Sequence, residues 1–180
     1  MPASLLLRFR PIAGGQAPSG LHKETRMQMD APRAVEGGKT LMIVEDEVLV
    51  AMTLRDELEG AGYQVLDLTD RHQEAVAVAR ESAPDLALVN IQLRGRDDGI
   101  ELAKHLKDLE IPVLLISGQV SRAQSAKTVA IGSMPKPYSA LEMVRAVTYL
   151  LAHLDGDEAF PRPEGLEVFR TNMDDLASAQ

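Results

Sequence analysis

The stretch LMIVEDEVLVAMTLRDELEG, residues 41–60, contains the pattern on which the fold depends. Its first four residues are all apolar and stop at three consecutive acids, as in a short strand that is buried on both faces. Residues 48–60 then place apolar side chains at helical spacings and close at Gly60. A buried strand followed directly by a helix is the repeating unit of an α/β fold.

Four further strand and helix pairs follow this first one along the chain. We expect strands at residues 63–68, 85–91, 112–116 and 131–134, and helices at residues 73–82, 99–108, 121–130 and 140–153. The strands are nearly all apolar, whereas a sheet with one solvent-facing side would alternate between apolar and polar residues. The sequence therefore predicts an α/β fold with a five-stranded, doubly wound parallel sheet that carries helices on both faces.

Charge and composition restrict the class of protein. The 180 residues include 19 Lys or Arg and 27 Asp or Glu, a net charge of −8, with six Phe and Tyr residues and no Trp. An acidic chain with so few aromatic rings is poorly suited to bind nucleic acid, so we expect no nucleic-acid partner. Because there is no cysteine and no apolar run of membrane-spanning length, we also expect a cytoplasmic protein that does not enter a membrane.

The same properties divide the chain into three parts. Residues 1–38 hold four prolines and five glycines without periodicity, which predicts a disordered leader. Met27 and Met29 precede the patterned region, so an alternative is that translation begins there. Residues 39–155 hold all of the periodic pattern and predict the folded domain. Residues 156–180 carry two basic and six acidic side chains and predict a flexible acidic tail.

Polar side chains stand at the carboxyl ends of four of the expected strands. They are Glu45 and Asp46 after the first strand, Asn90 at the end of the third, Ser117 after the fourth and Lys136 after the fifth. These ends meet at one edge of a parallel sheet, where ligands bind, so we expect one site. Adjacent carboxylates repel each other, and a divalent cation such as Mg²⁺ relieves that repulsion. A lysine and a hydroxyl beside them can hold an anionic oxygen.

Five short motifs, in this order, resemble the receiver domain of bacterial response regulators. They are residues 44–47, 84–93, 98–102, 115–118 and 136–138, which read VEDE, PDLALVNIQL, DGIEL, LISG and KPY. The resemblance covers about residues 39–155. It implies the flavodoxin-like, CheY-like fold with strand order 2-1-3-4-5 and a role in two-component phosphorelay signal transduction, here without an output domain.

The resemblance also implies a role for each site residue. The ligands of Mg²⁺ would be Glu45, Asp46, Asn90 and the backbone carbonyl of Gln92. Ser117 and Lys136 would contact the phosphoryl group. Ser117 and Ser133 would stand at the two positions that switch when a receiver is phosphorylated.

Two of these positions depart from the family pattern. Asn90 stands where the family has the aspartate that accepts the phosphoryl group, and an amide is not a nucleophile for that reaction. Ser133 stands where receivers usually have a Tyr or Phe ring. We therefore interpret the chain as a pseudo-receiver that is not an enzyme and binds Mg²⁺ weakly. Since an engineered Asp→Asn change would leave residue 133 alone, we favour natural divergence.

A pseudo-receiver would act by binding another signalling protein. We expect a histidine kinase, a phosphotransferase or a downstream effector, docked on the last helix, a face on which two copies could also pair. The expected docking residues are Leu141, Met143, Val144, Val147 and Tyr149.

Two alternatives remain open at this stage. The chain is an ordinary phosphorelay receiver if the native gene encodes aspartate at position 90, or if Asp97 or Asp98 accepts the phosphoryl group from a histidine kinase. A flavin carrier on the same fold is disfavoured, because Glu45, Asp46 and Glu47 would repel a flavin phosphate.

Overall fold

The computed structural model describes residues 38–93, 98–169 and 176. The leader expected at residues 1–38 therefore lies outside the described residues, except for Gly38. The helices and strands of the described part, in chain order, are β1 (Thr40–Val44), α1 (Val48–Gly60), β2 (Gln64–Val65), α2 (His72–Ser82), β3 (Leu86–Asn90), α3 (Gly99–Asp108), β4 (Val113–Ser117), α4 (Val120–Ser125), β5 (Gly132–Pro135), α5 (Ala140–Leu154) and β6 (Glu167–Val168).

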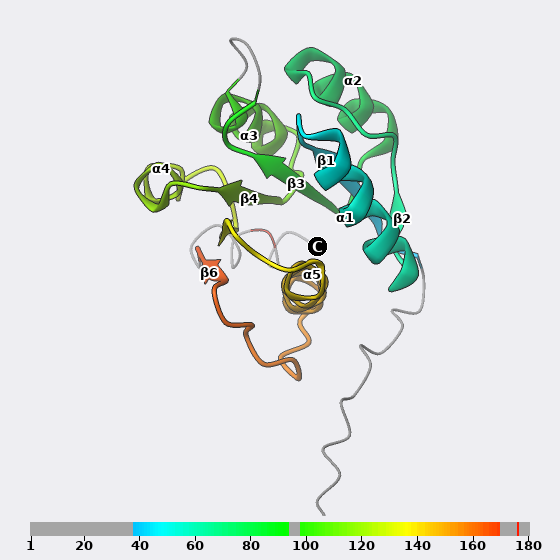
Figure 1. Cartoon of the computed structure of the whole chain (residues 1–180), viewed down its shortest axis with the longest axis vertical. Coiled ribbons are helices and arrows are strands. Elements are labelled where there is room, and N and C mark those ends of the chain that lie inside the picture. The colour runs from blue at the N-terminus through cyan, green and yellow to red at the C-terminus, as the bar shows by residue number, and fades with distance from the viewer. Residues whose placement is uncertain (1–37, 94–97, 170–175, 177–180) are drawn as a thin grey trace, which may run out of the picture. The chain divides into compact units, whose positions relative to one another are not determined.

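The strands form one sheet in the order β2-β1-β3-β4-β5-β6 (Figure 1). Strands β1 to β5 pair with one another in parallel, which confirms the doubly wound α/β fold and the order 2-1-3-4-5. The prediction of five strands and a flexible tail is corrected here, because a sixth strand, β6, pairs antiparallel with β5. A ladder of two residues leaves no periodic pattern in the sequence, so only the tertiary structure reveals it.

Successive side chains of each strand point to opposite faces of the sheet, and this alternation divides the core into two layers. Leu41 and Ile43 of β1 join the layer that contains the buried side chains of α1 and α5. Met42 and Val44 join the layer that contains those of α2 and α3. In Figure 1, α1 and α5 accordingly lie on one side of the sheet, and α2 and α3 on the other. This arrangement explains why the central strands β1, β3 and β4 are apolar on both faces along most of their length.

Helix α5 differs from the expected docking helix. Three of the five predicted docking side chains, Met143, Val144 and Val147, are buried in the core, whereas Leu141 is exposed. The prediction for these three is wrong because the apolar stripe of α5 covers the sheet and α1 instead of meeting solvent. None of the described helices is long and apolar enough to cross a membrane.

Candidate functional site

The first part of the site lies where β1 and β3 end side by side. Val44 and Val89 are register partners, so the residues that follow them, Glu45 and Asn90, become neighbours across the two strands. Both side chains are buried, with Glu45 3% and Asn90 5% exposed. The expected juxtaposition of these two strand ends is therefore present in the fold.

The side-chain amide of Asn90 is the hub of this cluster. Its nitrogen Nδ2 donates to Glu45 Oε1 at 2.9 Å and to Asp46 Oδ1 at 3.1 Å. It also donates to the backbone carbonyl of Gln92 at 2.9 Å. The amide oxygen accepts a bond from the Gln92 backbone N–H at 3.3 Å, which fixes which end of the amide faces the acids. Two N–H hydrogens are thus shared among three oxygen atoms.

Lys136 brings a positive charge to the same carboxylate. Its Nζ donates to Glu45 Oε2 at 2.9 Å and lies 3.8 Å from Glu47 Oε1. The side chain of Glu45 has no exposed surface, so it needs partners for both oxygens, and Asn90 and Lys136 supply them. The cluster therefore neutralises its buried carboxylate with the chain's own donors.

This arrangement answers whether the four predicted ligands fit a magnesium ion. The three oxygens that would bind the ion, on Glu45, Asp46 and Gln92, all face the N–H donor of Asn90. An N–H group cannot be a metal ligand, so a cation does not fit the cluster unless the amide turns over. Across the described ranges, no group of three or more His, Cys, Asp or Glu side chains could hold a metal ion.

The hydroxyl of Ser117 is bonded within its own loop and not to the Asn90 amide. The hydroxyl of Ser117 donates to the Gln119 carbonyl at 2.8 Å and accepts from the Gln119 N–H at 3.0 Å, which closes a local turn. Both serines are buried and line a slot of about 230 Å³ that Glu167 also lines. The Ser117 carbonyl also accepts a hydrogen bond from the Lys136 N–H at 2.8 Å, so the serine slot adjoins the charged cluster through the backbone of Lys136.

Asp98, an alternative acceptor, is held elsewhere. One carboxylate oxygen accepts from the Ile100 N–H at 2.9 Å and caps α3, and the other pairs with Arg122 at 2.7 Å. Asp97 lies outside the described residues. These contacts keep Asp98 at the start of α3 and do not place it in the Asn90 cluster.

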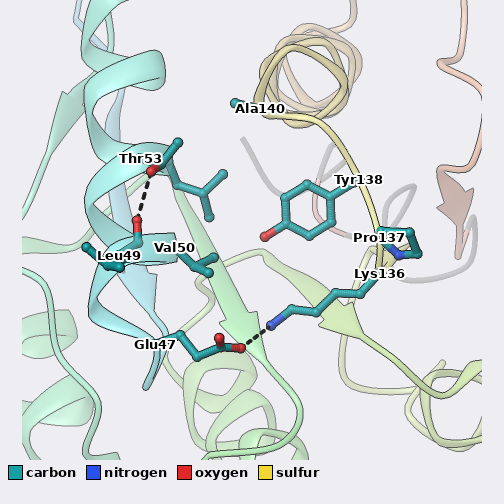
Figure 2. A pocket seen from close by; sticks show the side chains of 9 residues that line it. Glu47, Leu49, Val50, Thr53, Lys136, Pro137, Tyr138 and Ala140 are labelled. Carbon is teal, nitrogen blue, oxygen red and sulfur yellow. Dashed lines mark hydrogen bonds and ion pairs between the residues drawn. The ribbon is translucent and has the colours of Figure 1, made fainter.

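A pocket of about 580 Å³ adjoins the cluster and was not expected from the sequence. It lies between the first turns of α1 and the chain that leads from β5 into α5, and Glu47, Lys136 and Tyr138 are among its lining residues (Figure 2). Figure 2 shows the Tyr138 hydroxyl directed into this space. The only sequence signal for it was the motif that ends at Tyr138.

The Tyr138 hydroxyl has an unusual environment. Its oxygen is buried and finds no hydrogen-bond partner in the part of the chain that the structure describes. Burial, together with the negative charges of Glu45 and Glu47, raises the pKa of Tyr138 to about 12. The neutral phenol is therefore favoured in the folded state, and the stability that depends on it is lost as pH rises from about 10 through 12.

We expect Tyr138→Phe to raise the free energy of unfolding by about 1 kcal/mol at neutral pH, because a buried hydroxyl without a partner is destabilising. The variant should also lose less stability than the parent between pH 10 and 12. Urea unfolding across this pH range measures both effects. The matched control is Tyr63→Phe, which removes a buried hydroxyl bonded to Thr148 at 2.9 Å and should destabilise the protein. Equal destabilisation by both changes would contradict the assignment.

Comparison with known proteins shows which proteins this chain resembles in sequence. A family model for the response regulator receiver domain matches residues 41–148. The chain is 32% identical over 132 residues to the phosphate regulon transcriptional regulatory protein PhoB of Pseudomonas aeruginosa, covering 69% of this chain and 57% of that protein. It is 42% identical over 83 residues to the polar-differentiation response regulator DivK of Brucella abortus, covering 44% of this chain and 66% of DivK.

Solved structures agree with these matches. The signal receiver domain of a modulated diguanylate cyclase from Desulfovibrio desulfuricans aligns with a TM-score of 0.59 at 37% identity, covering 65% of this chain and 96% of that one. A CheY-like receiver domain protein from Methanospirillum hungatei aligns with a TM-score of 0.60 at 21% identity, over 65% of this chain and 96% of that one, and shows the fold alone. The chain covers 57% of PhoB and 34% of the regulator PhyR of Methylorubrum extorquens, so it spans about half the length of such curated relatives.

Proposed function

The chain belongs to the response-regulator receiver family, and on that premise we propose that it is a two-component signalling protein that binds other proteins without phosphorylation at residue 90. In this role it is a pseudo-receiver and not an enzyme. We place it in the cytoplasm, where two-component partners exchange signals.

One observation carries the proposal, namely the direction of the Asn90 amide. By resemblance, Asn90 stands where a receiver has its aspartate nucleophile, and receiver domains in general bind Mg²⁺ at this acidic pocket. Here the amide nitrogen donates to Glu45, Asp46 and Gln92, and its oxygen carries no full negative charge to attack a phosphoryl group. The lysine that would contact the phosphoryl group is paired with Glu45. The acids and the lysine of the cluster are thus paired with the chain's own groups.

The exposed apolar side chains support a binding role. In the described part of the chain, the large hydrophobic residues that are exposed are Val48 (67%), Leu49 (80%), Met52 (42%) and Leu141 (42%). The first three belong to α1 and the fourth to the first turn of α5, and both helices border the pocket that Tyr138 and Lys136 line. We assign the docking of a histidine kinase, phosphotransferase or effector to this α1–α5 surface, since receiver domains in general bind such partners.

Mass spectrometry tests the central claim. We expect the intact mass of the full chain to stay unchanged after incubation with acetyl phosphate and Mg²⁺, because no carboxylate stands at residue 90. The control is Asn90→Asp, which restores the carboxylate and should gain the mass of one phosphoryl group under the same conditions. A stable phosphoryl adduct on the unmodified chain would overturn the proposal and favour the alternative in which another side chain accepts the group.

A further inference from the structure

The segment from Leu166 to Phe169, here called the C-terminal strap, crosses the outer edge of β5. Its two end residues are both buried, with Leu166 4% and Phe169 6% exposed. Leu166 packs in the core layer of α1 and α5, whereas Phe169 packs in the layer of α2 and α3. The strap is therefore anchored on both faces of the sheet.

Backbone contacts hold the middle of the strap against β5. Gly132 pairs with Val168 and Ser133 with Glu167, and the Phe169 N–H donates to the Ile131 carbonyl at 2.8 Å. A methyl group built on Gly132 would lie 2.7 Å from the backbone oxygen of Glu167 but 3.7 Å from the nearest atom of Leu114. Glycine at this position thus lets the strap backbone approach β5. A larger residue at position 132 would clash with the strap but not with the core side chain of Leu114.

Polar contacts add to this attachment on the side of α4. The carboxylate of Glu167 accepts hydrogen bonds from the side-chain amide of Gln124 and lies 3.4 Å from Lys127 Nζ. The same lysine nitrogen lies 5.8 Å from the centre of the Phe169 ring. Side chains in and just after α4 therefore recognise the strap through one carboxylate and one aromatic ring.

The strap also lines the serine slot. This slot of about 230 Å³ is lined by Ser117 and Ser133 together with Gly165 and Glu167 of the C-terminal segment. Ser133 is directly paired with Glu167. A large ring at position 133 would need the space that the slot and the strap take up, so a small residue there and a strap across β5 are compatible, whereas a ring and a strap compete.

We propose that the outer edge of β5 is an interaction surface for an extended antiparallel strand, and that the chain keeps this surface closed with its own residues 166–169. An open edge strand offers unpaired N–H and C=O groups to any extended segment. The strap is tethered to α5 through residues 155–165, so its effective concentration at the edge is on the order of millimolar. The surface opens to an extended peptide with the Leu and Phe anchors only when the strap leaves.

Hydrogen exchange at the Phe169 amide measures how often the strap detaches from the edge of β5. In the full chain, Gly132→Ala should accelerate exchange of this amide by at least about tenfold, since the added methyl pushes against the strap backbone. Ser133→Tyr should do the same by filling the slot. The Ile91 amide, which donates to the Ile116 carbonyl at 2.9 Å in the centre of the sheet, should keep its protection in both variants.

Two matched variants isolate the cause. Gly118→Ala adds the same methyl where nothing lies within 4 Å, and Ser133→Ala removes the hydroxyl without adding bulk, so both should leave Phe169 exchange unchanged. Unchanged Phe169 protection in Gly132→Ala would overturn the proposal that the strap closes the edge of β5. Unchanged protection in Ser133→Tyr would overturn the competition between a ring and the strap.

A peptide tests whether the edge accepts a strand in trans. The probe is a synthetic peptide with the sequence of residues 161–169, PRPEGLEVF, added to the full-chain variant Phe169→Asp, whose own strap is weakened. The peptide should shift the amide NMR signals of residues 131–133 in the variant with a dissociation constant well below the effective concentration of the tethered strap, which is on the order of millimolar. The native chain should show no shift, because its own strap then keeps the edge closed. A peptide with Ser in place of both anchors is the control. No shift in the variant, or equal shifts in the native chain, would overturn the proposal.

Discussion

Replacing Asn90 by aspartate should raise the affinity for Mg²⁺ by at least about tenfold, or about 1.4 kcal/mol. The change removes the N–H donor that faces Glu45, Asp46 and Gln92, and it adds a third carboxylate to the cluster. A unit charge about 4 Å from another contributes on the order of 1 to 4 kcal/mol between the dielectric of water and that of a protein surface. Titration calorimetry of both proteins measures the difference.

The same variant should show a matching change in stability. Without Mg²⁺, Asn90→Asp should unfold at lower urea than the parent, because a carboxylate then faces Glu45 and Asp46 where the amide N–H donated to them. With Mg²⁺ at about 100 times the dissociation constant of the variant, the variant should regain about 2.7 kcal/mol, whereas the parent, bound at least about tenfold more weakly, should gain at most about 1.4 kcal/mol. Asn90→Ala removes the donor without adding charge and separates the two causes. Equal Mg²⁺ affinity in parent and Asn90→Asp would show that the cluster is not assembled as described.

Replacing Gly99 by alanine should lower the free energy of unfolding by about 3 kcal/mol, at the upper end of overpacking effects. Gly99 opens α3, and its N–H donates to the Ile91 carbonyl at 3.1 Å. A methyl group there would lie 2.2 Å from the backbone oxygen of Asn90 and 2.8 Å from the Ile91 Cα. Both neighbours are backbone atoms of the site, so they cannot move aside by a change of rotamer. The end of β3 must shift, and with it the Asn90 amide.

Urea unfolding measures the effect, with Gly118→Ala as the control. That glycine follows β4 at the same edge of the sheet, but an added methyl meets nothing within 4 Å, so the expected change is below about 0.5 kcal/mol. A Gly99→Ala protein as stable as the control would show that α3 does not press on the end of β3. The disturbance should also reach the cluster, because the Asn90 carbonyl and side chain belong to the same residue.

The sequence was informative wherever a pattern extended over several residues. The apolar runs of β1, β3 and β4 predicted buried parallel strands, and the structure confirms this prediction. Every residue of β3 and β4 is buried, as is every residue of β1 from Leu41 onward. Their order placed Glu45 beside Asn90, and those residues do meet. These results follow from burial, which acts on every side chain of an element and therefore leaves a regular signal.

Single contacts could not be predicted in the same way. The sequence contains Asn90, but the direction of its amide depends on the Gln92 N–H and on two acids from another strand. The apolar stripe of α5 was taken for a docking face, because a stripe has the same pattern whether it meets the core or a partner. The C-terminal strap has only two ladder residues.

The sequence by itself therefore determined the α/β class, the strand order through its family resemblance, and the set of residues at the strand ends. Tertiary structure alone decided that the Asn90 amide faces the acids, that the two serines line one slot with Glu167 and that the C-terminal strap closes the edge of β5. The physical reason is the range of the interactions. Hydrophobic periodicity is repeated along an element, whereas a hydrogen bond or a two-residue ladder depends on groups far apart in the chain that only folding brings together.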